Sequence, residues 1–173
     1  VKLFTDEVIG ENYYSQDELD EKRQQSIMDG QTPSFVITNG EKIFGLRLTF
    51  PHGQWEKGKG EELSPEKWPH ALEDTAYFQS LYIDPSIMRQ GWGRKMSLMS
   101  IEILKQLGSK GVVCHSWVES PNDSSGRYLR KLNFESICQY PEYWRPVDYV
   151  CPLCGKVCIC TAEEMYLDFT QGD

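Results

Sequence analysis

The chain has 173 residues, 39% of them hydrophobic, which suits one domain with a substantial core and requires no second one. Its formal net charge of −8 argues against nucleic acid or an anionic membrane as the main partner, because both demand clustered positive charge. No apolar run approaches the roughly 20 residues of a transmembrane helix and no secretory signal is visible, so we expect a cytoplasmic protein.

The first 30 residues predict two helices. Apolar residues in the segment 1–8 have helical spacing. Ser15 and Glu18 then form a Ser-x-x-Glu capping box, which opens a polar helix that we expect to end at Gly30.

Two strands at residues 35–38 and 43–50 follow, and Asn39-Gly40 between them is a strong hairpin signal. The next segment, 51–74, is polar and rich in Gly, Glu and Lys, yet it holds two tryptophans. Loops this long inside a compact domain are usually functional or disordered. Two interpretations stay open: a substrate-binding loop, or a surface excursion whose tryptophans pack back on the domain.

Residues 76–134 carry the most informative pattern of the chain. Residues 76–83 are aromatic and apolar and run into Asp84-Pro85, which predicts a strand ended by a turn. A glycine-containing turn follows, made of Met88, Arg89, Gln90, Gly91, Trp92, Gly93 and Arg94. Backbone N–H groups in such a turn, with the positive end of a following helix, bind phosphate without side-chain help. A plain surface turn is the alternative, but the strand-to-helix setting favours the phosphate role.

A helix, a strand and a second helix follow this turn. An apolar stripe with helical spacing predicts the first helix, which we expect to end at Gly108. The stripe consists of Met96, Met99, Ile103, Leu104 and Leu107. Residues 112–118 predict a strand, after which Asn122 or Asp123 caps a short helix. That helix ends at Asn133, and Asn is the usual substitute for Gly in the left-handed conformation of a helix end.

The order of these elements and the spacing of Gly91 and Gly93 resemble the Gcn5-related N-acetyltransferase (GNAT) superfamily. The resemblance implies an α/β (α+β) fold of the acyl-CoA N-acyltransferase type, a twisted and mostly antiparallel sheet flanked by helices. The resemblance covers most of the chain and is strongest over 76–134, and we expect residues 1–173 to form one domain. Because Val1 already lies in a helical pattern, we expect the family's first strand to precede the sequence as given.

In this family the turn holds the pyrophosphate of acetyl-CoA. The pantetheine arm pairs with the strand before the turn, where that strand and the next one splay apart. The matching cofactor contacts are Leu81, Tyr82, Ile83, Met88, Arg89, Gln90, Gly91, Trp92, Gly93, Arg94, Asn122 and Ser125. Met88 departs from the family, which carries Gln or Arg there. Arg89, Arg94 and Lys95 could supply cationic contacts to the phosphate oxygens.

Two catalytic side chains of the family are absent. Tyr77 stands where its histone acetyltransferases carry a basic glutamate, and Leu129 where many members carry a tyrosine that protonates the CoA thiolate. Tyr128, one residue earlier, is the candidate acid, although it would point about 100° away on the helix and packing is its alternative role. The candidates to replace the base are Glu73, Asp74, His115 and Glu119. Glu119 is favoured, because it directly follows the strand predicted at 112–118, close to the point where this strand is expected to splay from the strand at 76–83.

Four cysteines crowd into the segment 151–160: Cys151, Cys154, Cys158 and Cys160. Residues 151–155 resemble a zinc knuckle, and Cys158 and Cys160 would face one side of a strand. Four thiolates predict a closed tetrahedral Zn²⁺ site with a structural role. Free thiols and redox disulfides are the alternatives, and Cys138 or a second subunit could complete the site. A final strand predicted at 164–169 places the cluster in the connection between the family's sixth and seventh strands.

These observations predict an N-acetyltransferase that moves an acetyl group from acetyl-CoA directly to a primary amine, and an acidic surface suits a cationic acceptor. The alternative is a non-catalytic CoA-binding or zinc-bearing interaction or sensor module on the same fold, which the departures at Tyr77, Met88 and Leu129 favour. A zinc-finger nucleic-acid binder is disfavoured by the acidity and by the lack of a basic recognition helix. The acceptor, a small molecule or a protein amine, stays open. The acyl group and the oligomeric state also stay open, and a homodimer is one alternative.

Overall fold

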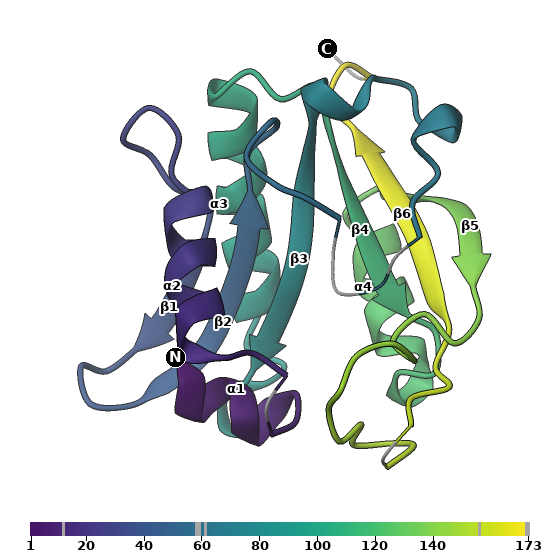
Figure 1. The fold of residues 1–173 in the computed structure, drawn as a ribbon. Helices are drawn as coiled ribbons and strands as arrows, with labels where there is room; N and C mark the ends of the chain where they lie inside the picture. The colour runs from purple at the N-terminus through teal and green to yellow at the C-terminus, as the bar shows by residue number, and fades with distance from the viewer. Residues whose placement is uncertain (12, 58–59, 61, 156, 172–173) are drawn as a thin grey trace.

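The computed structural model describes residues 1–11, 13–57, 60, 62–155 and 157–171. A six-stranded sheet lies at the centre of this part of the chain, with the strand order β1-β2-β3-β4-β6-β5 (Figure 1). The strands are β1 Phe35–Thr38, β2 Ile43–Phe50, β3 Thr75–Ile83, β4 Gly111–Trp117, β5 Glu135–Tyr140 and β6 Ala162–Asp168. Among them β3 and β4 form the one parallel pair, so the predicted mostly antiparallel sheet is confirmed. β6 begins before the predicted start at Glu164.

Helices cover both faces of the sheet. α1 (Lys2–Val8) and α2 (Gln16–Gln25) lie in front of it in Figure 1, and α3 (Trp92–Gln106) and α4 (Ser124–Arg130) lie behind it. The front core contains Tyr14, Leu48, Phe50, Trp68, Tyr77 and Tyr166, and the back core contains Phe78, Leu104, Val112, Leu129, Phe134 and Met165. Strand alternation sends neighbouring residues to these two cores. No helix of the described residues is long and apolar enough to cross a bilayer.

The capping box at the start of α2 is present as predicted. The Glu18 N–H donates to Ser15 Oγ at 3.1 Å, and the Ser15 N–H donates to Glu18 Oε2 at 2.8 Å. α2 nevertheless ends before the predicted Gly30, because Met28 and Gln31 pair across a tight turn. The β1–β2 hairpin has the predicted bounds.

The buried side of α3 differs from the predicted stripe. α3 ends where expected, and Gly108 follows it with a φ of 90°. Met99, however, is 42% exposed, whereas Ser97 and Ser100 are buried. The Ser100 hydroxyl donates to the Pro33 carbonyl oxygen at 2.6 Å, so small hydroxyl side chains let α3 lie close to the rest of the domain.

The cap of α4 is also different from the prediction. The Ser120 hydroxyl accepts a hydrogen bond from the Ser125 N–H at 3.0 Å. Neither Asn122 nor Asp123 caps the helix with its side chain, and both have positive φ, 55° and 50°. These two residues turn the chain sharply into α4 instead of capping it.

The end of α4 is the left-handed turn that the sequence predicts. Asn133 has a φ of 65°, and the Phe134 N–H donates to the Leu129 carbonyl oxygen at 3.1 Å. This turn aims the Phe134 ring at Phe78 of β3, and their ring centroids are 5.7 Å apart. The helix end therefore fixes part of the back core.

Replacing Asn133 with alanine should lower the free energy of unfolding by about 1 kcal/mol, because alanine tolerates the left-handed conformation less well than asparagine does. Asn133→Gly is the matched control and should be as stable as the wild type. Urea denaturation measures both variants. An equal loss in both would mean that the Asn133 side chain, and not its backbone conformation, stabilises this end.

Candidate functional site

β3 and β4 pair over only part of their length. Four residue pairs join them, the last of which is Phe78–Cys114, and beyond it β4 pairs with β6 alone. At this point β3 has a bulge at Gln79, which has no partner in the register of β2 against β3. Figure 1 shows the two strands diverging toward their carboxyl ends. Beyond Phe78, the β3 edge that faces β4 therefore has no strand partner in the described part of the chain.

The turn after β3 leads directly into α3. Arg89 and Gly91 have left-handed φ values of 62° and 82°, and Gly91 is the residue that precedes the first helical one. No heavy atom lies within 4 Å of the place that a Cβ on Gly91 would take. A Cβ on Gly93 would contact the Leu81 side chain at 3.4 Å. The first N–H groups of a helix have no partner within the helix, and its N-terminus is the positive end of its dipole, so the geometry of this turn suits an anion.

An acidic residue holds the start of this turn. Asp84 accepts hydrogen bonds from the Ser86 N–H at 2.9 Å and from the Ser86 hydroxyl at 2.6 Å, and Lys42 lies 3.0 Å from its carboxylate. These bonds from Ser86, together with Lys42, lower the pKa of Asp84 to about 2. The carboxylate is therefore ionised at neutral pH and already paired, which limits its repulsion of a nearby phosphate.

The other predicted cofactor contacts lie on both sides of the divergence. Leu81, Tyr82 and Ile83 are half-buried along β3, and the side chains of Met88, Arg89, Gln90 and Arg94 are exposed around the turn. Asn122 and Ser125 lie at the start of α4, where the Ser116 hydroxyl of β4 donates to Ser125 Oγ at 3.0 Å. The structure thus brings the turn residues together at the start of α3 and places the other two at the start of α4, which packs on β4.

The candidate acid Tyr128 joins α4 to α3. Its hydroxyl oxygen lies 3.1 Å from the Gly93 carbonyl oxygen and 2.5 Å from Ser97 Oγ. Burial raises the pKa of Tyr128, and Arg47 and Ser97 partly offset that rise. Leu129 is buried in the back core. Tyr128 therefore has a structural role between the two helices, and its role as an acid stays a prediction.

His115 and Glu164 form a buried pair on the front face. They are cross-strand neighbours in β4 and β6, their side chains are 3% and 0% exposed, and His115 Nε2 lies 3.6 Å from Glu164 Oε2. His115 Nε2 has no hydrogen-bond partner among the described residues, and Nδ1 lies 3.3 Å from the hydroxyls of both Tyr77 and Tyr143. Burial alone would raise the pKa of Glu164, but the nearby His115 ring and the hydrogen bond from the Trp68 N–H outweigh it and lower that pKa.

The remaining base candidates lie elsewhere. Both carboxylate oxygens of Glu119 accept the Thr161 N–H, at 3.0 and 2.9 Å. Asp74 pairs with Lys110 at 2.7 Å, and Glu73 is exposed beside it. Of the four candidate bases, His115 is the one that directly follows Cys114, the β4 residue of the last β3–β4 pair. Glu164, the partner of His115, was missed as a site residue, and the sequence carries little signal for it, because the same strand also holds Glu163 and Asp168.

A sequence model of the acetyltransferase (GNAT) family matches residues 3–134. The chain belongs to the GNAT family. No curated protein sequence matches it. The splay between β3 and β4 and the glycine turn both lie within the matched region.

Solved structures show the same GNAT fold. The ribosomal-protein-S18-alanine N-acetyltransferase of Escherichia coli has a TM-score of 0.61 and 15% identity, and the match covers 92% of this chain and 80% of that one. A Bacillus subtilis acetyltransferase in complex with CoA has a TM-score of 0.59 and 17% identity, over 89% and 84% of the two chains. The protein yncA of Salmonella typhimurium, solved with acetyl-CoA, has a TM-score of 0.51 and 18% identity, over 80% and 65%.

The polar loop of this GNAT domain packs on the front face. Trp55 stacks on Tyr77 with ring centroids 4.8 Å apart, and its indole N–H donates to the Thr75 carbonyl oxygen at 2.7 Å. The Trp68 N–H donates to Glu164 Oε1 at 2.8 Å. The interpretation that the tryptophans pack back on the domain is therefore confirmed. Residues 58, 59 and 61 of the predicted substrate loop lie outside the described residues.

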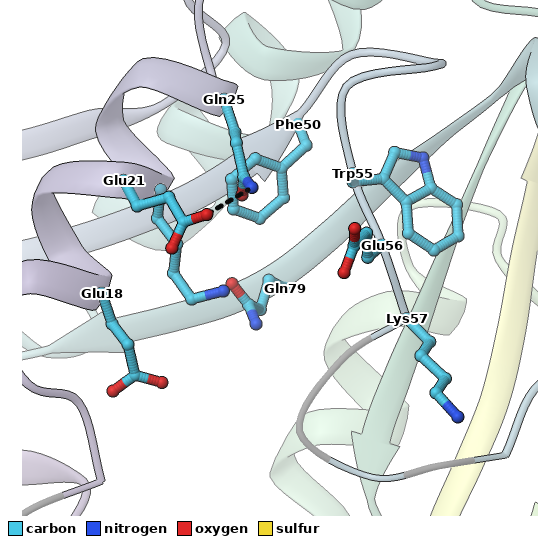
Figure 2. Close-up of a pocket in the computed structure, with 9 residues that line it drawn as sticks. Glu18, Glu21, Gln25, Phe50, Trp55, Glu56, Lys57 and Gln79 are labelled. Carbon is cyan, nitrogen blue, oxygen red and sulfur yellow. Dashed lines mark hydrogen bonds between the residues drawn. The ribbon is translucent and has the colours of Figure 1, made fainter.

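A pocket of about 140 Å³ lies between α2 and this loop, beside the bulge. It is lined by Glu18, Glu21, Lys22, Gln25, Phe50, Trp55, Glu56, Lys57 and Gln79. Figure 2 shows Gln79 of β3 between Glu18 of α2 and Glu56 of the loop. Three glutamates face two lysines, so the pocket is acidic, and it opens on the front face of the sheet.

The four cysteines meet in one cluster. The Sγ atoms that lie within 4.8 Å of one another are those of Cys151, Cys154, Cys158 and Cys160. Cys151 and Gly155 exchange two backbone hydrogen bonds, at 2.8 and 2.9 Å, which close the predicted knuckle. Burial alone would raise the pKa of Cys151, but the N–H groups of Cys154 and Leu153 lower it to about 7.

The second half of the cluster lacks the predicted strand. Cys158 and Cys160 lie in irregular chain, yet both are buried while Ile159 between them is 61% exposed, so the two thiols still face one side. Cys138 lies outside the cluster, with its Sγ 3.4 Å from Ser64 Oγ. Residue 156 of the predicted segment lies outside the described residues.

Proposed function

We propose that the protein is an acetyl-CoA-dependent N-acetyltransferase that transfers the acetyl group directly to a primary amine. The observation that carries this proposal is the divergence of β3 from β4 at the Gln79 bulge, together with a turn at Gly91, where α3 begins, that suits an anion. An unpaired strand edge can bind the amides of a pantetheine arm, and the N-terminus of α3 can bind its pyrophosphate. Two solved structures of the same fold contain CoA or acetyl-CoA, which supports the assignment.

His115 is the proposed proton acceptor, in place of Glu119. The Glu119 carboxylate already binds the Thr161 N–H, whereas His115 Nε2 has no hydrogen-bond partner among the described residues. Glu164 lies next to His115 and can stabilise the imidazolium that forms. The neutral amine attacks the thioester carbon and its nitrogen loses a proton to His115.

The acceptor in this proposal is a cationic amine that enters from the front face. The pocket between α2 and the loop is acidic and reaches Gln79, at the point where β3 leaves β4. Glu18, Glu21 and Glu56 would favour an ammonium group over a neutral or acidic one. Polyamines and the amines of peptides both carry this chemistry.

We also infer a structural Zn²⁺ at the cysteine cluster. Zn–S bonds of about 2.3 Å in a tetrahedron require sulfur atoms roughly 3.8 Å apart. Cys160 Sγ lies 3.4 Å from Cys154 Sγ and 4.0 Å from Cys151 Sγ, so the sulfur atoms need little movement to accept the ion. Four thiolates would leave no open position, which favours a role in folding over catalysis. A reducing compartment such as the cytoplasm would keep these thiols available.

Calorimetric titration should give micromolar binding of acetyl-CoA and CoA, and Gly91→Asp should abolish it, because a carboxylate there repels phosphate. Gly30→Asp is the matched control, since Gly30 also has a positive φ and no neighbour within 4 Å of an added Cβ. Failure of the folded wild type to bind either ligand would refute the proposed function. Binding without turnover in a broad panel of amines would support the sensor alternative.

His115→Gln should lower kcat/KM by about 100-fold with the best acceptor of that panel, because glutamine cannot accept the proton. Binding of acetyl-CoA should be unchanged. His52→Gln is the control, because His52 bonds to Ser109, outside the proposed site. Similar rates for His115→Gln and the wild type would remove His115 from the reaction.

Protein purified under reducing conditions should contain one zinc ion per chain by elemental analysis. Cys154→Ser should lose the metal and melt at a lower temperature, because the binding free energy contributes to folding. Cys138→Ser is the control and should keep the ion, since Cys138 lies outside the cluster. Wild type that folds and melts identically with zinc and with a chelator would contradict the metal site.

A further inference from the structure

Arg47 is a buried cation that has no counter-charge among the described residues. It lies in the middle of β2 with 3% of its surface exposed, and its side chain points to the back face. Its Nε and Nη2 atoms are buried and have no hydrogen-bond partner among the described residues. Burial lowers the pKa of Arg47 to about 10, and the titratable groups that act on it are Tyr128 and Cys114 instead of a carboxylate.

This arrangement costs stability. An ionised group taken out of water requires a partner charge or a full set of hydrogen bonds, and Arg47 has neither in the part of the chain that the structure describes. The Phe78 ring provides partial compensation, because the guanidinium carbon lies 3.4 Å from its centroid. The rest of β2 is mainly apolar, so an aliphatic side chain at position 47 would suit the fold better. An unpaired buried cation of this kind is suited to a ligand atom that carries negative charge.

The position of Arg47 identifies that atom. Its guanidinium stacks on Phe78, and Phe78 and Cys114 form the last β3–β4 pair. Arg47 therefore lies behind the point where the strands part, and His115 lies in front of it. A thioester held between the strands would have the amine and His115 on one side and Arg47 on the other.

We propose that Arg47 stabilises the negative charge that develops on the CoA sulfur as the thioester breaks, an inference that rests on the proposed acetyltransferase function. The amine lone pair forms the C–N bond, and the electron pair of the C–S bond stays on sulfur. The proton lost by the amine nitrogen goes to His115, and CoA leaves as a thiolate that water protonates later. Arg47 donates no proton and lowers the energy of the thiolate by its charge and N–H groups.

Leu129, which stands where many family members carry the tyrosine acid, supports this role of Arg47. Leu129 is an aliphatic residue in the back core and can donate no proton. The Tyr128 hydroxyl is already held between Gly93 and Ser97. A fixed positive charge can stabilise a leaving thiolate that has no proton donor. Arg47 is a buried cation whose charge acts on Tyr128 of α4.

Ionisation of bound CoA tests the proposal without an acceptor. The ultraviolet absorbance of the thiolate, followed against pH, should show that the wild type lowers the pKa of the CoA thiol by about one unit or more relative to free CoA. Arg47→Met should bind CoA but lose this shift, and Arg23→Met, an exposed change on α2, should keep it. With an acceptor, Arg47→Met should also lower kcat about 100-fold while the KM for acetyl-CoA stays within threefold.

The variants also separate charge from shape. Arg47→Met should fold and be at least as stable as the wild type, because it removes an unpaired buried charge. Arg47→Lys should keep the lowered thiol pKa, and Arg47→Gln should lose it, so this pair decides the question even if Arg47→Met does not fold. An unchanged thiol pKa in Arg47→Gln would overturn the proposal and leave the transferase assignment intact. Wild type that binds no CoA would instead refute the transferase function itself.

Discussion

The proposed chemistry depends on one constraint, the end of β3–β4 pairing at Phe78 and Cys114. The bulge at Gln79 turns β3 away at this point, and the following residues lose their strand partner on one side. Backbone N–H and C=O groups without partners are costly when water is excluded, so this edge favours a ligand that pairs like a strand. The position of the bulge thereby sets where a thioester would lie. His115 would lie in front of that thioester and Arg47 behind it.

The cysteine cluster is connected to the front side through a few hydrogen bonds. The Tyr143 N–H donates to the Cys160 carbonyl oxygen at 3.1 Å, and the Tyr143 ring stacks on His115 with centroids 4.5 Å apart. The Glu119 carboxylate binds the N–H of Thr161, the residue after the last cysteine. A metal that fixes this segment would also fix the aromatic wall around His115. Structural zinc and catalysis are therefore linked in this account through packing, without a direct role for the metal in the reaction.

Local patterns predicted several turns and helix ends, because each depends on neighbouring residues: the capping box at Ser15, the hairpin at Asn39, the left-handed end at Asn133 and the knuckle at Cys151. The arrangement of the elements followed from the resemblance to the GNAT superfamily. The base was not predictable in the same way. Position in the sequence favoured Glu119, whereas the contacts that favour His115 involve residues distant in sequence: Thr161 binds Glu119, and Glu164 lies beside His115. Arg47 is recognisable in the sequence as a charged residue inside a mainly apolar strand. That no described residue offers it a counter-charge is visible only in the structure.

A crystal structure of the protein with acetyl-CoA tests the central claim most directly. The account predicts that the pantetheine amides hydrogen-bond to the β3 backbone between Gln79 and Ile83, with the pyrophosphate on the N–H groups around Gly91 and the sulfur beside Arg47. Acetyl-CoA bound elsewhere on the surface, with β3 and β4 still unpaired beyond Phe78, would contradict it.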